Sequence, residues 1–140
     1  MKVRIILFLF AALVFSCRKN RNHPVPSIPF EITINMNLPS YNALQGVGGW
    51  TYVTGGSKGI IVYRKSYDEF MAFDRHSPAE GGTECTTPLT PNEDNFLELD
   101  DICSGAKFSL YDGSAISGSE LGLRQYQALW DGSNLIRISN

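Results

Sequence analysis

The chain has 140 residues, with 12 basic and 14 acidic side chains and a formal net charge of −2. This length is enough for one domain with its own core but not for two. The charge is unevenly distributed, because residues 30–140 contain 7 basic and all 14 acidic residues, which gives this segment a net charge of −7. An acidic body argues against nucleic-acid binding, which needs a cationic face.

The amino-terminal segment has the pattern of an export signal. Lys2 and Arg4 provide a short cationic start, and residues 5–15 form an unbroken apolar run of eleven residues. Such a run is too short to span a bilayer as a helix but suits the core of a signal peptide. The sequence therefore predicts a signal peptide over residues 1–16.

The end of this segment resembles a bacterial lipoprotein signal, since the small residue Ser16 directly precedes Cys17. The resemblance implies that Cys17 becomes the lipid-bearing first residue of the mature protein and anchors it in a membrane. Arg18 stands where some bacteria place an aspartate that retains lipoproteins at the inner membrane. We therefore expect attachment to the outer membrane, facing the periplasm.

Residues 17–29 read as a proline-rich linker with almost nothing to bury. At about 3 Å per residue, an extended segment of this kind could hold the domain on the order of 35 Å from the membrane. His23 lies in this linker and is expected to be solvated. The basic residues that follow Cys17 could rest on anionic lipid head groups, or could be remnants of export requirements.

Residues 30–140 show strand patterns throughout. Residues 30–38 alternate apolar and polar side chains, which indicates a half-buried strand. Residues 59–63 are apolar without alternation, which favours burial on both faces. Further strands are expected at residues 50–53, 70–74, 85–90, 96–99, 107–111, 123–130 and 134–138. The sequence thus predicts an all-β domain of nine or ten short strands, with a single capped helical turn at residues 66–69.

From Gly59 onward the chain resembles a Rieske domain, a small fold of stacked antiparallel β-sheets that carries a two-iron, two-sulfur cluster. The resemblance covers about 80 of the 124 residues that follow the signal. It rests on the order and spacing of these segments: residues 59–64, residues 73–75, Pro78, residues 105–108, the turn at residues 112–114, Gly118, Leu123 and Tyr126.

The ligand positions of the family are not kept. In Rieske domains two loops supply two cysteine thiolates and two histidine imidazoles. The corresponding positions here are Ser77, Ala79, Asp101 and Ser104. Independently of the alignment, residues 30–140 contain two cysteines and one histidine. We therefore expect no cluster of the usual ligation, no metal site and no cofactor.

Some Rieske proteins carry a disulfide that ties the two cluster loops together, and Cys85 and Cys103 fall near the corresponding places. In an oxidising compartment they are an even pair once Cys17 is lipidated. The resemblance therefore implies a Cys85–Cys103 disulfide. Two separate buried thiols are the alternative.

The sequence gives little support for a hydrolytic site, a calcium site or a phosphate-binding loop. Asp74, His76 and Ser77 suggest a hydrolase, but adjacent residues 76 and 77 of a strand point to opposite faces, and a Gly-x-Ser-x-Gly turn is absent from the sequence. Four acidic residues could surround calcium, although their spacing matches no calcium loop: Glu93, Asp94, Asp100 and Asp101. The glycines at positions 46–59 do not precede a predicted helix and so do not form a phosphate-binding loop.

Most aromatic residues fall on predicted strands, where core packing or cross-strand contact is expected. These are Tyr63, Phe70, Phe73, Phe108, Tyr111, Tyr126 and Trp130. Tyr41, Trp50 and Tyr67 are expected to be partly exposed, either packing on the core or contacting a glycan or a protein.

The sequence thus predicts a non-enzymatic, lipid-anchored envelope protein that serves as a binding or accessory module for an envelope partner. Residues 77–85 and 100–106 would form the former cluster tip, either as an inert cap or as a contact surface. The alternatives are an electron-transfer protein that holds iron–sulfur or metal by unconventional ligands, and an envelope enzyme.

Overall fold

The computed structural model describes residues 22–140. The predicted signal peptide, Cys17 and the first part of the predicted linker lie outside the described residues. Within residues 22–140, no helix has the length and hydropathy needed to cross a membrane.

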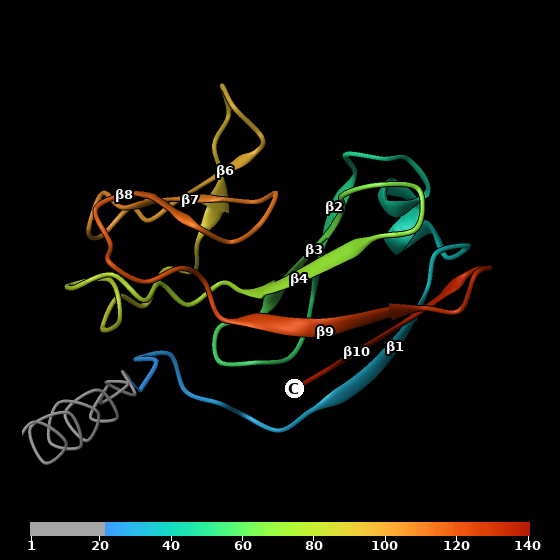
Figure 1. Cartoon of the computed structure of the whole chain (residues 1–140), viewed down its shortest axis with the longest axis horizontal. Coiled ribbons are helices and arrows are strands. Elements are labelled where there is room, and N and C mark those ends of the chain that lie inside the picture. The colour runs from blue at the N-terminus through green and yellow to red at the C-terminus, as the bar shows by residue number, and fades with distance from the viewer. Residues whose placement is uncertain (1–21) are drawn as a thin grey trace, which may run out of the picture.

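Apart from one short 3₁₀ helix, the regular secondary structure of the described residues is β-strand, as the sequence predicts, and the strands form two antiparallel sheets (Figure 1). The larger sheet has the strand order β1-β10-β9-β4-β3-β2 and the smaller one has the order β5-β6-β7-β8. The strands of the larger sheet are β1 (Glu31–Asn35), β2 (Trp50–Val53), β3 (Ile60–Arg64), β4 (Phe70–Asp74), β9 (Gln125–Trp130) and β10 (Leu135–Ser139). Those of the smaller sheet are β5 (Thr90–Pro91), β6 (Glu98–Asp100), β7 (Lys107–Ser109) and β8 (Ala115–Ser117).

Strands β3 and β4 are buried along their whole length because each of their faces packs against a different core. One face contributes Ile60, Val62 and Ala72 to a core shared with the strands β1, β9 and β10. The opposite face contributes Ile61 and Phe73 to a second core, shared with the small sheet. The small sheet (yellow to orange in Figure 1) thus lies over this second face, which explains the missing alternation in residues 59–63.

Three local expectations were wrong. The strand expected over residues 85–90 forms only at its end, as β5 (Thr90–Pro91). The strand expected over residues 30–38 ends at Asn35, and a 3₁₀ helix, η2 (Pro39–Gln45), follows with Pro39 in its first turn. Residues 66–69 form the hairpin connection between β3 and β4 rather than a helical turn, since the Lys65 and Ser66 amides both donate to the Glu69 carbonyl.

The aromatic residues follow the predicted pattern with one exception. Phe73 and Phe108 are fully buried, and Tyr63, Phe70 and Tyr126 nearly so. Tyr111, however, is 50% exposed, because it lies in the turn that follows β7 rather than in a strand.

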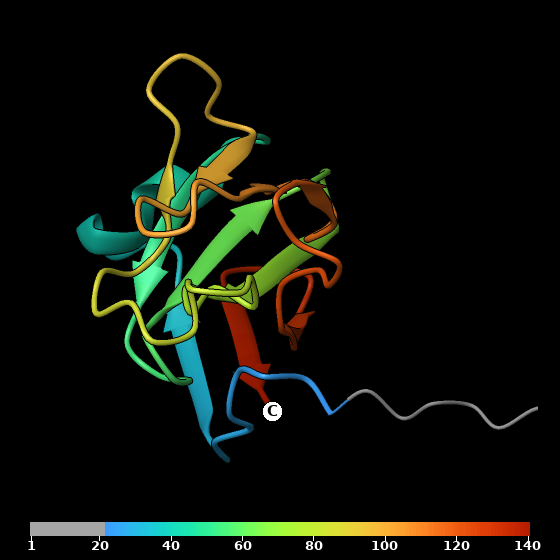
Figure 2. The ribbon, with the colours of Figure 1, turned by 90° about the vertical axis from the view of Figure 1, so that its left-hand side faces the viewer.

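Residues 22–29 pack against the domain, contrary to the expectation that this part of the linker has almost nothing to bury. Val25 is fully buried, and its carbonyl accepts a hydrogen bond from Arg124 Nε at 3.0 Å. His23 is not a freely solvated residue, because its ring contacts the Gly122 carbonyl at 3.0 Å. The segment also lies beside the carboxyl end of the described chain (Figure 2), and Asn140 donates to the Ile28 carbonyl.

Candidate functional site

Two loops, residues 77–85 and 100–106, form the tip that the sequence singles out. The first follows β4 and the second connects β6 to β7. Cys85 and Cys103 lie at disulfide distance, with 6.0 Å between their Cα atoms. The pair therefore fits the predicted bridge between the two loops.

Of the four positions compared with Rieske ligands, Ser77 and Ser104 both form hydrogen bonds to the carboxylate of a third, Asp101. Asp101 is 3% exposed and accepts hydrogen bonds from the Ser104 hydroxyl at 2.6 Å and from the Ser77 hydroxyl. The backbone amides of Cys103 and Ser104 also donate to it, at 2.9 and 3.3 Å. The fourth position, Ala79, is buried in the second core.

These bonds determine the charge state of the tip. Burial by itself would raise the pKa of Asp101, but the hydrogen bonds from Ser104, Ser77 and the two amides outweigh it and hold the pKa below its ordinary value. The tip therefore contains an ionised carboxylate whose acceptor sites are used by its own loops.

The interior of the tip is also tightly filled. Gly82 lies so close to Asp101 and Ser77 that a Cβ at position 82 would overlap the Asp101 carboxylate and the Ser77 hydroxyl. Within residues 22–140, the only group of three potential metal ligands close enough to share an ion is Cys85, Asp101 and Cys103. With both sulfurs at bonding distance from each other, this group does not fit the two thiolates and two imidazoles of a Rieske cluster.

A second polar network is centred on Asp74, which is fully buried at the end of β4, just before the first tip loop. Its carboxylate accepts hydrogen bonds from the Ser57 amide at 2.5 Å, the Lys58 amide at 3.1 Å and the His76 amide at 2.8 Å. The Tyr126 hydroxyl also donates to it, at 2.6 Å. Burial and then this bond to Asp74 raise the pKa of Tyr126 far above its usual value, so Tyr126 remains a hydrogen-bond donor.

His76 connects this network to the tip. Its Nε2 faces the Thr83 carbonyl at 2.6 Å, and its Nδ1 faces the Ser57 hydroxyl at 2.8 Å. A carbonyl can only accept, so Nε2 carries a proton and donates to Thr83. Sequence reasoning missed Ser57, whose glycine-rich surroundings indicated only a turn.

The residues 74, 76 and 77 do not form a hydrolytic triad. The Ser77 hydroxyl contacts Asp101 and the Ala79 amide rather than His76. Ser57 does contact His76, but the Ser57 and Lys58 amides are bound to Asp74 and are therefore not available to stabilise an oxyanion.

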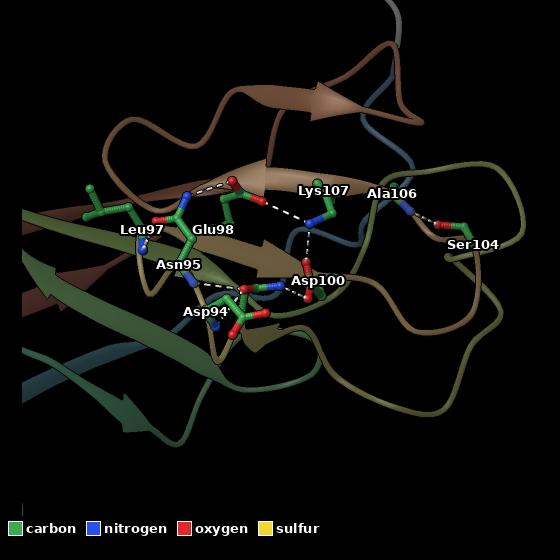
Figure 3. A network of polar contacts seen from close by, with 9 residues as sticks. Asp94, Asn95, Leu97, Glu98, Asp100, Ser104, Ala106 and Lys107 are labelled. Carbon is green, nitrogen blue, oxygen red and sulfur yellow. Dashed lines mark hydrogen bonds and ion pairs between the residues drawn. The ribbon is translucent and has the colours of Figure 1, made fainter.

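The four residues weighed as a calcium site are not brought together around one point. Asp101 is bound within the tip. Asp100 Oδ1 lies 3.6 Å from Lys107 Nζ, and Figure 3 draws this pair. Glu93 and Asp94 are exposed in the β5–β6 connection. Lys107 also pairs with Glu98 at 3.0 Å, so the neighbourhood of Asp100 already contains a cation.

No protein-family model matches the chain, and no curated protein matches it.

Proposed function

We propose that the chain is a lipid-anchored envelope protein, attached to the outer membrane through Cys17 and facing the periplasm. Its β domain is a Rieske-like domain without a cluster, and it acts as a non-catalytic binding or accessory module. The tip formed by residues 77–85 and 100–106 is its contact surface for an envelope protein.

The observation that supports this proposal most is the contrast between the inside and the outside of the tip. Inside, Asp101 is saturated by hydrogen bonds from Ser77, Ser104 and two backbone amides. Outside, Ile102 is 79% exposed, the largest exposed fraction among the large apolar side chains of the described residues. A side chain of this kind on a loop held by a cross-link is well suited to insert into a partner.

Site-specific photo-crosslinking in the native cell tests this proposal. A benzophenone amino acid in place of Ile102 is expected to give a discrete adduct with an envelope protein. Tyr67 is the matched control, because it is 74% exposed but lies in the hairpin connection at the opposite end of β4 from Ser77. The proposal is wrong if the probe at position 102 gives no adduct, or gives the same adducts as the probe at position 67.

A further inference from the structure

A shallow depression of about 500 Å³ lies beside the turn between β2 and β3, outside the tip. Tyr52, Ser57, Lys58 and Arg75 are among the residues that line it. Its volume falls in the range of small-molecule sites in proteins. Two of the lining residues, Lys58 and Arg75, are basic, whereas the domain as a whole is acidic.

The guanidinium of Arg75 is held in a fixed position in this depression. Its Nε donates to the Leu89 carbonyl at 2.9 Å, and its flat face lies 3.7 Å from the centre of the Tyr52 ring. Both contacts restrict the side chain before any ligand arrives, which lowers the entropy cost of binding.

Within residues 22–140, the two terminal nitrogens of Arg75 make no hydrogen bond, because its one side-chain hydrogen bond is made by Nε. Within the described part of the chain, the ion pairs are Lys65–Glu69, Lys107–Glu98 and Lys107–Asp100, and none involves Arg75. The neighbouring carboxylate of Asp74 points instead to the amides of Ser57 and Lys58. Partial burial lowers the pKa of Arg75, and the nearby Tyr52 partly offsets this effect.

We propose that this depression binds the oxyanion of a small molecule, a carboxylate or a phosphate monoester, through the terminal nitrogens of Arg75. A planar guanidinium matches both groups with two parallel hydrogen bonds. Lys58 contributes mainly to the walls, because its ammonium group donates to the Thr83 and Cys85 carbonyls. The residues that line the depression lie outside the tip, although Lys58 contacts the first tip loop. The proposal does not rest on the contact role proposed for Ile102.

Isothermal titration calorimetry on the full chain in a neutral detergent tests this proposal with three probes of similar size. Glucuronate carries a carboxylate, glucose 6-phosphate carries a phosphate, and glucose carries no charge. We expect one or both anions to bind in the millimolar range or tighter, more weakly at higher ionic strength, and glucose not to bind. Binding of only one anion identifies the preferred group. Absence of binding by both anions, or equal binding of glucose, overturns the proposal.

Variants assign the binding to Arg75. Arg75→Gln is expected to weaken anion binding by at least about tenfold, since it removes a charge-assisted, two-point contact. Arg137→Gln is the matched control, because it removes the same charge from an exposed position on β10 and should leave the affinity unchanged. If Arg75→Gln fails to fold by circular dichroism, Arg75→Lys and Tyr52→Ala take its place, and each should weaken binding several-fold. Unchanged affinity in the folded Arg75 variants overturns the proposal.

Discussion

Replacing Asp74 with alanine is expected to lower the free energy of unfolding by about 4 kcal/mol. The change leaves three backbone amides, those of Ser57, Lys58 and His76, without their acceptor, together with the Tyr126 hydroxyl. Each buried donor that loses its acceptor costs about 1–3 kcal/mol, and water can partly replace the acceptor at the half-buried Ser57 and Lys58. Urea denaturation followed by tryptophan fluorescence measures the loss.

Tyr126→Phe is the graded control for this prediction, because it removes one donor and leaves the carboxylate in place. We expect it to cost about 1 kcal/mol. The double variant should lose less than the sum of the two single losses, since both changes remove the same hydrogen bond. A loss below 1 kcal/mol for Asp74→Ala, by urea denaturation, would mean that the network does not support the fold.

Removing the Cys85–Cys103 bridge is expected to lower the free energy of unfolding by about 3 kcal/mol, from the entropy of the denatured chain. The two cysteines are 18 residues apart in the sequence, so the bridge closes a loop of moderate length. Cys85→Ala combined with Cys103→Ser is the suitable variant, because Cys85 is buried and Cys103 is exposed. Denaturation with urea, with and without a phosphine reductant, measures the difference.

Cys17→Ser is the control for the bridge, since it removes the third cysteine of the chain and leaves the pair intact. This variant should show no alkylated thiol by intact mass without reductant, and two after reduction. Two alkylated thiols before reduction would instead show that Cys85 and Cys103 are separate thiols.

Much of the fold follows from local sequence patterns. The predicted bounds of the strands at residues 50–53 and 70–74 agree with β2 and β4, because turn residues or polar residues border these runs. Strand β8 was missed, since Ala115–Ser117 is short and lies among serines and glycines. It becomes a strand through pairing with β7, where Ala115 lies opposite Phe108. Such pairing is a tertiary effect that no local pattern contains.

The burial of Val25 was missed for a related reason. A single valine between two prolines has no periodicity, so its pattern does not differ from that of a solvated linker. The segment packs beside Arg124, which is 99 residues away along the chain and donates to the Val25 carbonyl.

The polar network was predicted only in part. Asp74, His76 and Ser77 were identified as candidates, but Ser57 was not, although it is the residue that contacts His76. The register of the β3–β4 hairpin brings Ser57 and His76 together. Ile60 pairs with Asp74, so the residues that precede Ile60 lie beside those that follow Asp74. Knowledge of the register would therefore have identified Ser57.

Iron and acid-labile sulfide analysis of the full chain, purified without exposure to oxygen, determines whether the β domain holds an iron–sulfur cluster. We predict a colourless protein without stoichiometric iron or sulfide, because Ser77, Asp101 and Ser104 bind one another and Ala79 is packed in the core. Two irons and two sulfides per chain, with visible absorption, would contradict the account and would establish an electron-transfer protein with unconventional ligands.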